Sequence, residues 1–191
     1  MIDKKYNIIL GSKSPRRSEI LNKLQIKFKI SIPDCDEKYP QTLKGCKISE
    51  FIAIKKSESL LSEIKKNDLL ITCDTIIVTK ENDILNKPID KNDAYNMLNK
   101  LNNNEHYVIS SVCLRSNNKL KVFSEETKVT FNRIPQEIIQ KYVNSNQPLD
   151  KAGGYGIQDW FGLIGVKKIS GNYTNVMGLP AGSLYFNIRE F

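Results

Sequence analysis

Two serines and two arginines follow a short apolar run near the start of the chain. Ser14 is predicted to be the N-cap of a helix and Pro15 its first residue, where the missing N–H costs nothing. The helix macrodipole disfavours cations at this end, so Arg16 and Arg17 in the first turn indicate an anion site. Together with Ser12, they would suit phosphate. Two solvated arginines on an exposed helix start are the alternative interpretation.

A single carboxylate, Asp74, lies inside the apolar run 69–78. This run is apolar on both faces, which is typical of a buried central strand. Burying a carboxylate costs free energy unless it meets a cation, a metal or a catalytic role. If its charge were isolated, Asp74→Asn would slightly stabilise the fold. The alternative is a structural aspartate bonded to Thr75 or to backbone amides.

Further charged residues extend this chemistry. Asp36 and Glu37, in an acidic turn, would offer oxygens to a hard cation such as Mg²⁺, although a solvated turn explains them equally well. Lys56 and Lys87 carry no signal by themselves, because lysine is abundant here. Basic side chains for phosphates, with carboxylates for a metal and for a base, suit metal-assisted hydrolysis of a phosphoanhydride.

Other sites are excluded by motif and composition. The chain has neither a Walker A loop nor a dinucleotide fingerprint, and His106 is its one histidine. Its four cysteines are widely spaced, which fits reduced thiols rather than a zinc cluster. The net charge of +8 is spread over scattered lysines, so we expect no nucleic-acid partner. Without a long apolar segment or a signal peptide, we expect a cytoplasmic protein with no membrane partner. A homodimer is left open.

The apolar patterns predict one α/β domain, residues 1–191, with a long mixed sheet. Strands are predicted at 26–32, 69–78, 84–85, 106–115, 120–133 and 161–169. Helices are predicted from Ser14, Ser49, Asp90 and Pro135 and after Gly178–Pro180, with a glycine-rich loop at 147–158. The tight turn between 106–115 and 120–133 favours an antiparallel pair.

Seven blocks, taken together, resemble the Maf family of nucleoside triphosphate pyrophosphatases, also called septum-formation-inhibitor-like proteins. The resemblance extends from near Ile8 to near Leu184. The blocks are Ser12–Arg17, Asp34–Glu37, Ala53–Lys56, Cys73–Ile77, Asn86–Pro88, Asp150–Gln158 and Gly178–Pro180. The first and the sixth are the most specific. Gly11 stands where the family commonly has alanine, and Trp160 where glycine is usual.

The resemblance implies a two-lobed α/β fold around a long mixed sheet, similar to that of inosine triphosphate pyrophosphatases, with the nucleotide in a central cleft. It implies cleavage of a nucleoside triphosphate to the monophosphate and pyrophosphate with a divalent metal, Mg²⁺ or Mn²⁺. Asp74 would be the proton acceptor and, with Glu37, a metal contact. The other implied roles are base selection by Arg16, Thr75 and Gln158, and phosphate binding by Ser12, Arg17, Lys56 and Lys87.

The block Asp150–Gln158 is similar to that of the branch acting on dTTP and UTP, and differs from the branch acting on 7-methyl-GTP. Removal of unwanted or modified nucleotides is the implied biological role. The main alternative is a non-catalytic, nucleotide-binding regulator of septum formation that keeps the pocket without turnover. The presence of Asp74, Glu37, Lys56 and Lys87 argues against that alternative.

Overall fold

In the computed structural model of this chain, residues 5–145 and 147–191 are described. Within that part of the chain, no helix combines the length and the apolar character needed to cross a membrane.

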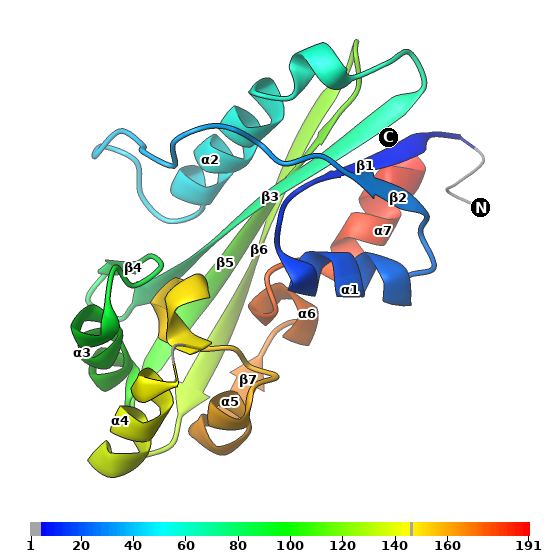
Figure 1. Cartoon of the computed structure of the whole chain (residues 1–191). Helices are drawn as coiled ribbons and strands as arrows, with labels where there is room; N and C mark the ends of the chain where they lie inside the picture. Colours follow the sequence, from blue (N-terminus) through cyan, green and yellow to red (C-terminus); the bar gives the residue numbers. More distant parts are fainter. Residues whose placement is uncertain (1–4, 146) are drawn as a thin grey trace. The chain divides into compact units, whose positions relative to one another are not determined.

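The described strands form one mixed sheet (Figure 1). The strand order is β2-β1-β3-β5-β6-β7, with β4 paired to β3 outside this path. β1 pairs in parallel with β2 and β3, whereas β4 pairs antiparallel with β3 and β7 antiparallel with β6. The bounds are β1 Asn7–Gly11, β2 Phe28–Ile30, β3 Asp68–Thr79, β4 Ile84–Leu85, β5 Glu105–Arg115, β6 Leu120–Phe131 and β7 Val166–Ser170. The predicted α/β class with a long mixed sheet is confirmed.

Seven α-helices accompany the strands in the described residues. They are α1 Pro15–Lys23, α2 Cys46–Glu58, α3 Lys91–Leu101, α4 Gln136–Asn144, α5 Trp160–Gly165, α6 Tyr173–Val176 and α7 Ala181–Glu190. Short 3₁₀ turns occur at Leu61–Glu63, Gln147–Asp150 and Ala152–Gly154.

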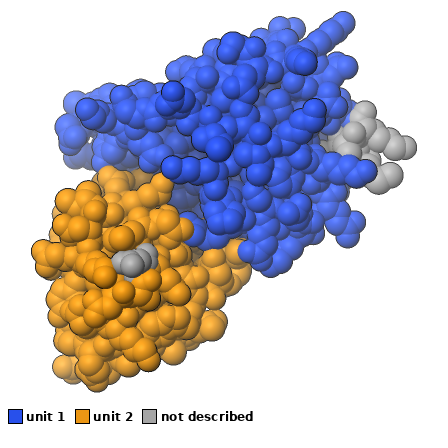
Figure 2. Space-filling view, in the orientation of Figure 1, with its two compact units in different colours: residues 1–75, 110–125, 178–191 blue, residues 76–109, 126–177 orange. Residues whose placement is uncertain are grey.

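The chain divides into two compact units, coloured separately in Figure 2. Unit 1 comprises residues 1–75, 110–125 and 178–191, and it holds β1, β2, α1, α2 and α7. Unit 2 comprises residues 76–109 and 126–177, and it holds β4, β7 and α3 to α6. β3, β5 and β6 each contribute residues to both units.

The parallel pairing of β1 with β3 positions the first candidate residues. Gly11 is level with Thr72, so Ser12 follows β1 where β3 continues toward Asp74. A Cβ atom on Gly11 would lie 2.5 Å from Thr72 Cγ2, a distance that real Cβ atoms do not reach. Glycine at this position therefore allows β1 and β3 to pair closely even though the residue opposite, Thr72, is β-branched.

Several predicted element boundaries were wrong. α1 begins at Pro15 as predicted, but the Ser14 side chain caps no backbone N–H. Ser49 does not start α2, because that helix begins at Cys46 after Gly45. The strand predicted at 26–32 is only Phe28–Ile30, and that at 161–169 is α5 followed by β7. α6 was not foreseen, whereas Asp90 caps α3 as predicted by accepting from the Asp93 N–H at 2.8 Å.

The core of unit 2 contains His106, which is fully buried on β5 between Phe131 and Tyr155. Burial lowers the pKa of His106 from 6.5 to about 3. An unfolded chain with the ordinary pKa takes up a proton between these two values, whereas the folded chain does not. The effect of His106 on the free energy of unfolding is therefore absent above pH 6.5, and it lowers this free energy as the pH drops from 6.5 toward 3.

We expect this residue to contribute up to about 1.4 kcal/mol of lost stability per pH unit in that window. Urea unfolding of the wild type and of His106→Gln at pH 7 and pH 5 measures it. The variant should lose less stability between the two pH values than the wild type. Equal losses would show that His106 binds a proton equally in the folded and the unfolded chain, so that burial does not lower its pKa.

Candidate active site

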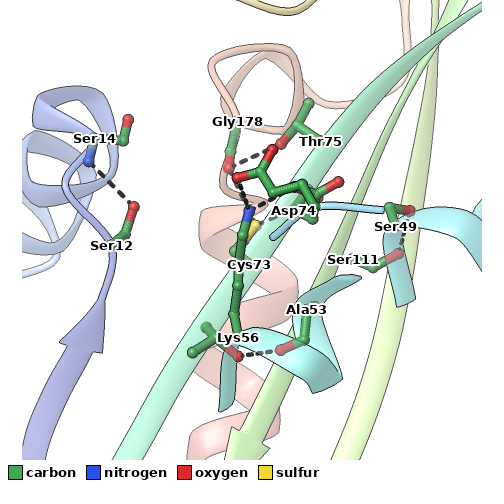
Figure 3. A network of polar contacts seen from close by, with 12 residues as sticks. Ser12, Ser14, Ser49, Ala53, Lys56, Cys73, Asp74, Thr75, Ser111 and Gly178 are labelled. Carbon is green, nitrogen blue, oxygen red and sulfur yellow. Dashed lines mark hydrogen bonds and ion pairs between the residues drawn. The ribbon is translucent and has the colours of Figure 1, made fainter. Parts of the chain in front are cut away.

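A lysine bridges two carboxylates at the centre of the candidate site. Lys56 Nζ lies 2.7 Å from Asp74 Oδ1 and 2.9 Å from Glu37 Oε1. Lys56 and Asp74 are buried, whereas the Glu37 side chain is half exposed. α2 supplies the lysine and β3 the aspartate, and Figure 3 shows the Lys56 side chain reaching from its helix to the strand. The cation that a buried Asp74 needs is therefore Lys56.

The two neighbouring carboxylates keep Lys56 protonated. Burial by itself works to lower the pKa of Lys56, and nearby Arg17 acts in the same direction. The carboxylates of Asp74 and Glu37 outweigh both effects, so that the pKa of Lys56 is raised above its ordinary value. Lys56 is therefore a permanent cation here. Of its three N–H donors, two are directed to carboxylates, which leaves one for a ligand.

The acidic turn before α2 is tied to that helix at two adjacent positions. Lys55 forms an ion pair with Asp36, and Lys56 forms the pair with Glu37. The hydrogen bond from Lys55, followed by that from the Lys38 N–H, lowers the pKa of Asp36. Both bonds are accepted by the same oxygen, Asp36 Oδ1, whereas Glu37 is the residue of this turn that shares Lys56 with Asp74.

Arg17 is oriented by three acceptors. Its Nε donates to the Gly178 carbonyl at 2.9 Å, Nη1 to Ser12 Oγ at 3.2 Å and Nη2 to Thr75 Oγ1 at 3.2 Å. The Gly178 carbonyl also accepts from Thr75 Oγ1 at 3.4 Å and from Cys73 Sγ at 3.3 Å. A guanidinium has five N–H donors, so one remains on each terminal nitrogen for an anion.

Ser12 connects this guanidinium to the start of α1. Its Oγ accepts from the Ser14 N–H at 3.2 Å and from Arg17, and only 6% of the residue is exposed. Ser12, rather than Ser14, is thus the serine that organises the turn. Since Ser12 Oγ is the acceptor in both of these bonds, its hydroxyl hydrogen is available to a phosphate oxygen.

The remaining predicted residues have more varied settings. Arg16 is half buried in the first turn of α1 in unit 1. Lys87 and Gln158 belong to unit 2, where Lys87 is exposed and Gln158 half buried. Unit 1 by itself therefore brings together Ser12, Arg17, Glu37, Lys56, Asp74 and Thr75.

The two carboxylates of this cluster would suit a hard divalent cation that takes only a few of its ligands from the protein. Among the described residues, no group of three or more His, Cys, Asp or Glu side chains could hold a metal ion. Mg²⁺ commonly uses one or two carboxylates and completes its octahedron with water and substrate phosphates. Glu37 and Asp74 fit that role, provided that a phosphate oxygen supplies further ligands.

Two contributors were missed by the sequence analysis. Ser110, fully buried on β5, lies 2.9 Å from Thr75 Oγ1, and the Gly178 carbonyl is the acceptor on which Arg17, Thr75 and Cys73 converge. Gly178 was noted only as part of a family block. A backbone acceptor leaves no signal in side-chain type, so the sequence offers no direct indication of its role.

Comparison with known proteins decides the family. The family model described as "Maf-like protein" matches residues 7–191 of this chain. The chain belongs to the Maf-like protein family. The predicted resemblance is thereby confirmed over nearly the whole length.

Two curated relatives of this Maf-like protein carry the same name. The dTTP/UTP pyrophosphatase of Flavobacterium johnsoniae is 44% identical, with 95% of this chain and 93% of that protein covered. The dTTP/UTP pyrophosphatase of Bacteroides fragilis is also 44% identical, with coverages of 97% and 96%. Among solved structures, the Staphylococcus aureus Ham1 protein is matched over 65% of this chain and 71% of its own, with 16% identity and a TM-score of 0.40.

Proposed function

We propose that this chain hydrolyses nucleoside triphosphates, dTTP and UTP above others, to the nucleoside monophosphate and pyrophosphate. The observation that carries the proposal is the buried Asp74–Lys56 pair, with Glu37 on the same ammonium group and Arg17 oriented nearby. This arrangement joins a carboxylate base to cations for phosphate. Relatives with 42–44% identity over nearly the whole chain, each named dTTP/UTP pyrophosphatase, support the substrate class.

In the proposed reaction, water attacks the α-phosphorus and the bond to the β-phosphate oxygen breaks. Asp74 accepts the proton of the attacking water. Arg17, Lys56 and the Ser12 hydroxyl donate to phosphate oxygens, on which negative charge accumulates as pyrophosphate leaves. Lys87 would add a further positive charge there. A divalent cation held by Glu37 and Asp74, Mg²⁺ or Mn²⁺, would neutralise phosphate charge when bound.

The Gln158 amide gives a physical reason why uracil and thymine would be preferred to cytosine. Its Oε1 is buried and has no hydrogen-bond partner among the described residues. Uracil and thymine present an N3–H donor beside a carbonyl, which an amide oxygen and its NH₂ group match together. Cytosine presents an acceptor at N3 and a donor beside it, so the same amide orientation opposes it. We therefore assign Gln158 to the base, with Arg16 and Thr75 as the other selecting residues.

A substrate panel tests the function. Pyrophosphate release is measured from dTTP, UTP, CTP, dATP, GTP and 7-methyl-GTP, with and without Mg²⁺ or Mn²⁺. We expect dTTP and UTP to exceed the others in the presence of metal. A preference for 7-methyl-GTP would reject the dTTP/UTP assignment and leave the reaction class intact. Nucleotide binding without turnover of any triphosphate would instead favour the non-catalytic regulator of septum formation.

Replacing Gln158 by alanine is expected to reduce the preference for UTP over CTP. A well-formed pair of hydrogen bonds to a base is worth about 1–3 kcal/mol of discrimination, so the ratio of kcat/KM should fall about 5- to 150-fold. Gln140→Ala, which removes an exposed glutamine of α4, is the matched control and should leave the ratio unchanged. An unchanged ratio in Gln158→Ala would remove this residue from base selection.

The cellular setting completes the proposal. All four cysteines are free thiols, two of them buried, and this supports our proposal that the protein acts in the reducing cytoplasm. Removal of unwanted or modified nucleotides there is the role that we propose.

A further inference from the structure

A buried histidine and a buried tyrosine form a polar pair inside unit 2, among aromatic rings. His106 Nε2 lies 2.7 Å from the Tyr155 hydroxyl oxygen. The Phe131 ring packs edge-on against both partners, with centroid distances of 5.1 Å to His106 and 4.8 Å to Tyr155. No step of the proposed reaction uses this pair.

The direction of this hydrogen bond follows from counting donors. Burial raises the pKa of the Tyr155 hydroxyl and lowers that of His106, so both groups are neutral. If Nε2 donated, the hydroxyl hydrogen and the Nδ1 lone pair would both lack a partner, since no described residue bonds to Nδ1. If the hydroxyl donates to Nε2, only the Nδ1–H is left. Tyr155 is therefore the donor, and His106 carries its proton on Nδ1.

This arrangement keeps one buried N–H without a partner among the described residues. Such a group costs free energy that a phenylalanine at the same position would avoid. The imidazole therefore costs stability, and what it supplies in return is an acceptor for the Tyr155 hydroxyl.

Tyr155 belongs to the segment 150–159, which presents Gln158. Asp159, the last residue of this segment, is held by Lys151 near its start. The Lys151 Nζ lies 3.3 Å from Asp159 Oδ2 and donates to Asp150 Oδ1 at 2.6 Å. The Tyr142 hydroxyl donates to the same Asp159 oxygen at 3.3 Å. Gln158 thus lies between one tie at Asp159 and another at Tyr155, and these two anchors limit how far its backbone can move.

We propose that His106 is a positioning residue for base selection: through Tyr155 it holds the segment that presents the Gln158 amide. The inference rests on the proposed function, because base selection has meaning only for a nucleotide substrate. It adds two residues, His106 and Tyr155, that contact no substrate and act through Gln158.

The test compares KM, kcat and the UTP/CTP ratio in variants that break this one hydrogen bond. Tyr155→Phe removes only the hydroxyl, and His106→Phe removes the acceptor. Each should raise KM for UTP and lower the UTP/CTP ratio of kcat/KM about 5- to 10-fold, the loss of one hydrogen bond, with kcat within about two-fold of wild type. The double variant should match the single ones, because all three lack the same bond.

Rescue and packing controls separate positioning from stability. In His106→Gln an amide oxygen can take the place of Nε2, so the ratio should return toward the wild-type value. Phe131→Leu disturbs the same aromatic cluster without touching the hydrogen bond, and it should lower the melting temperature while the ratio stays unchanged. All assays are run well below every melting midpoint.

Three results would contradict the inference. In the first, Tyr155→Phe melts earlier yet keeps the wild-type KM and ratio, which would make the pair purely structural. If that variant does not fold, the same result in His106→Phe decides. A shift of the ratio in Phe131→Leu equal to that in Tyr155→Phe would assign the effect to packing. A wild-type chain inactive on every triphosphate would overturn the proposed function, and the inference with it, before any variant is compared.

Discussion

Asp74→Asn is expected to lower pyrophosphate release about 10²–10⁴-fold while the chain remains folded. Asparagine has nearly the same size as aspartate, but its amide cannot accept a proton from water at neutral pH. It also carries no charge for a metal, so loss of that contact would add to the effect. The measurement is pyrophosphate release from UTP, with nucleotide binding and a thermal melt on the same preparation.

The structure reverses one expectation about the stability of this variant. An isolated buried carboxylate would make the asparagine form slightly more stable, but Asp74 is paired with Lys56 at 2.7 Å. After the substitution the amide oxygen can still accept from Lys56, but the negative charge that balanced this buried lysine is lost, and the Glu37 carboxylate that remains is half exposed. We therefore expect a loss of about 1.5–3 kcal/mol, the range for a hydrogen bond to a charged group.

Thr72→Val is the matched control for that loss. Thr72 is two residues earlier on β3, and its hydroxyl donates to the Ala53 carbonyl of α2 at 2.7 Å. Valine removes this bond with little change in shape, so stability should fall by about 1 kcal/mol without loss of turnover. If Thr72→Val and Asp74→Asn were equally inactive, Asp74 would be a structural residue. A fully active Asp74→Asn protein would remove it from the mechanism.

Arg17→Ala is expected to reduce turnover about 10²–10³-fold, the usual effect of removing one preorganised donor to a developing anion. Arg17→Lys should recover only part of this, because an ammonium group cannot satisfy the Gly178 carbonyl, Ser12 and Thr75 while also donating to phosphate. Steady-state kinetics with dTTP, read as kcat and KM separately, measures both variants.

The control for charge alone is Lys66→Ala, which removes an exposed cation of the same unit. It should leave turnover unchanged if the net charge of +8 is mostly background. Equal losses in Lys66→Ala and Arg17→Ala would mean that diffuse electrostatics governs binding, as in a nucleic-acid-binding protein.

Some predictions from the sequence were correct because the signal is local. The run around Asp74 is apolar on both faces, and only a central strand buries both faces, so β3 was predicted nearly to its ends. Asp90 was correctly predicted as a cap, since an aspartate before a helix bonds to a backbone N–H within its own first turn.

Other local patterns were ambiguous, and neighbouring segments decided between them. The apolar run from Phe161 suits a strand or a buried helix. It forms α5, with Gly162 so close to the preceding loop that a Cβ atom would lie 2.2 Å from the Gly156 carbonyl oxygen. Ser49 is a good N-cap by type, yet it lies inside α2 and contacts Ser111 at 2.6 Å, a residue that is distant in sequence.

The sequence by itself determined which residue types this site has, and through the family blocks it also determined their expected roles. The tertiary structure decided how they pair. Lys56 was one lysine among many until α2 placed it on Asp74, and Arg17 reaches the Gly178 carbonyl across 161 positions of the chain. Local periodicity reports only which face of an element is buried, whereas a contact between two elements depends on their packing. The ion pair and the orientation of the guanidinium therefore became visible only in the folded chain.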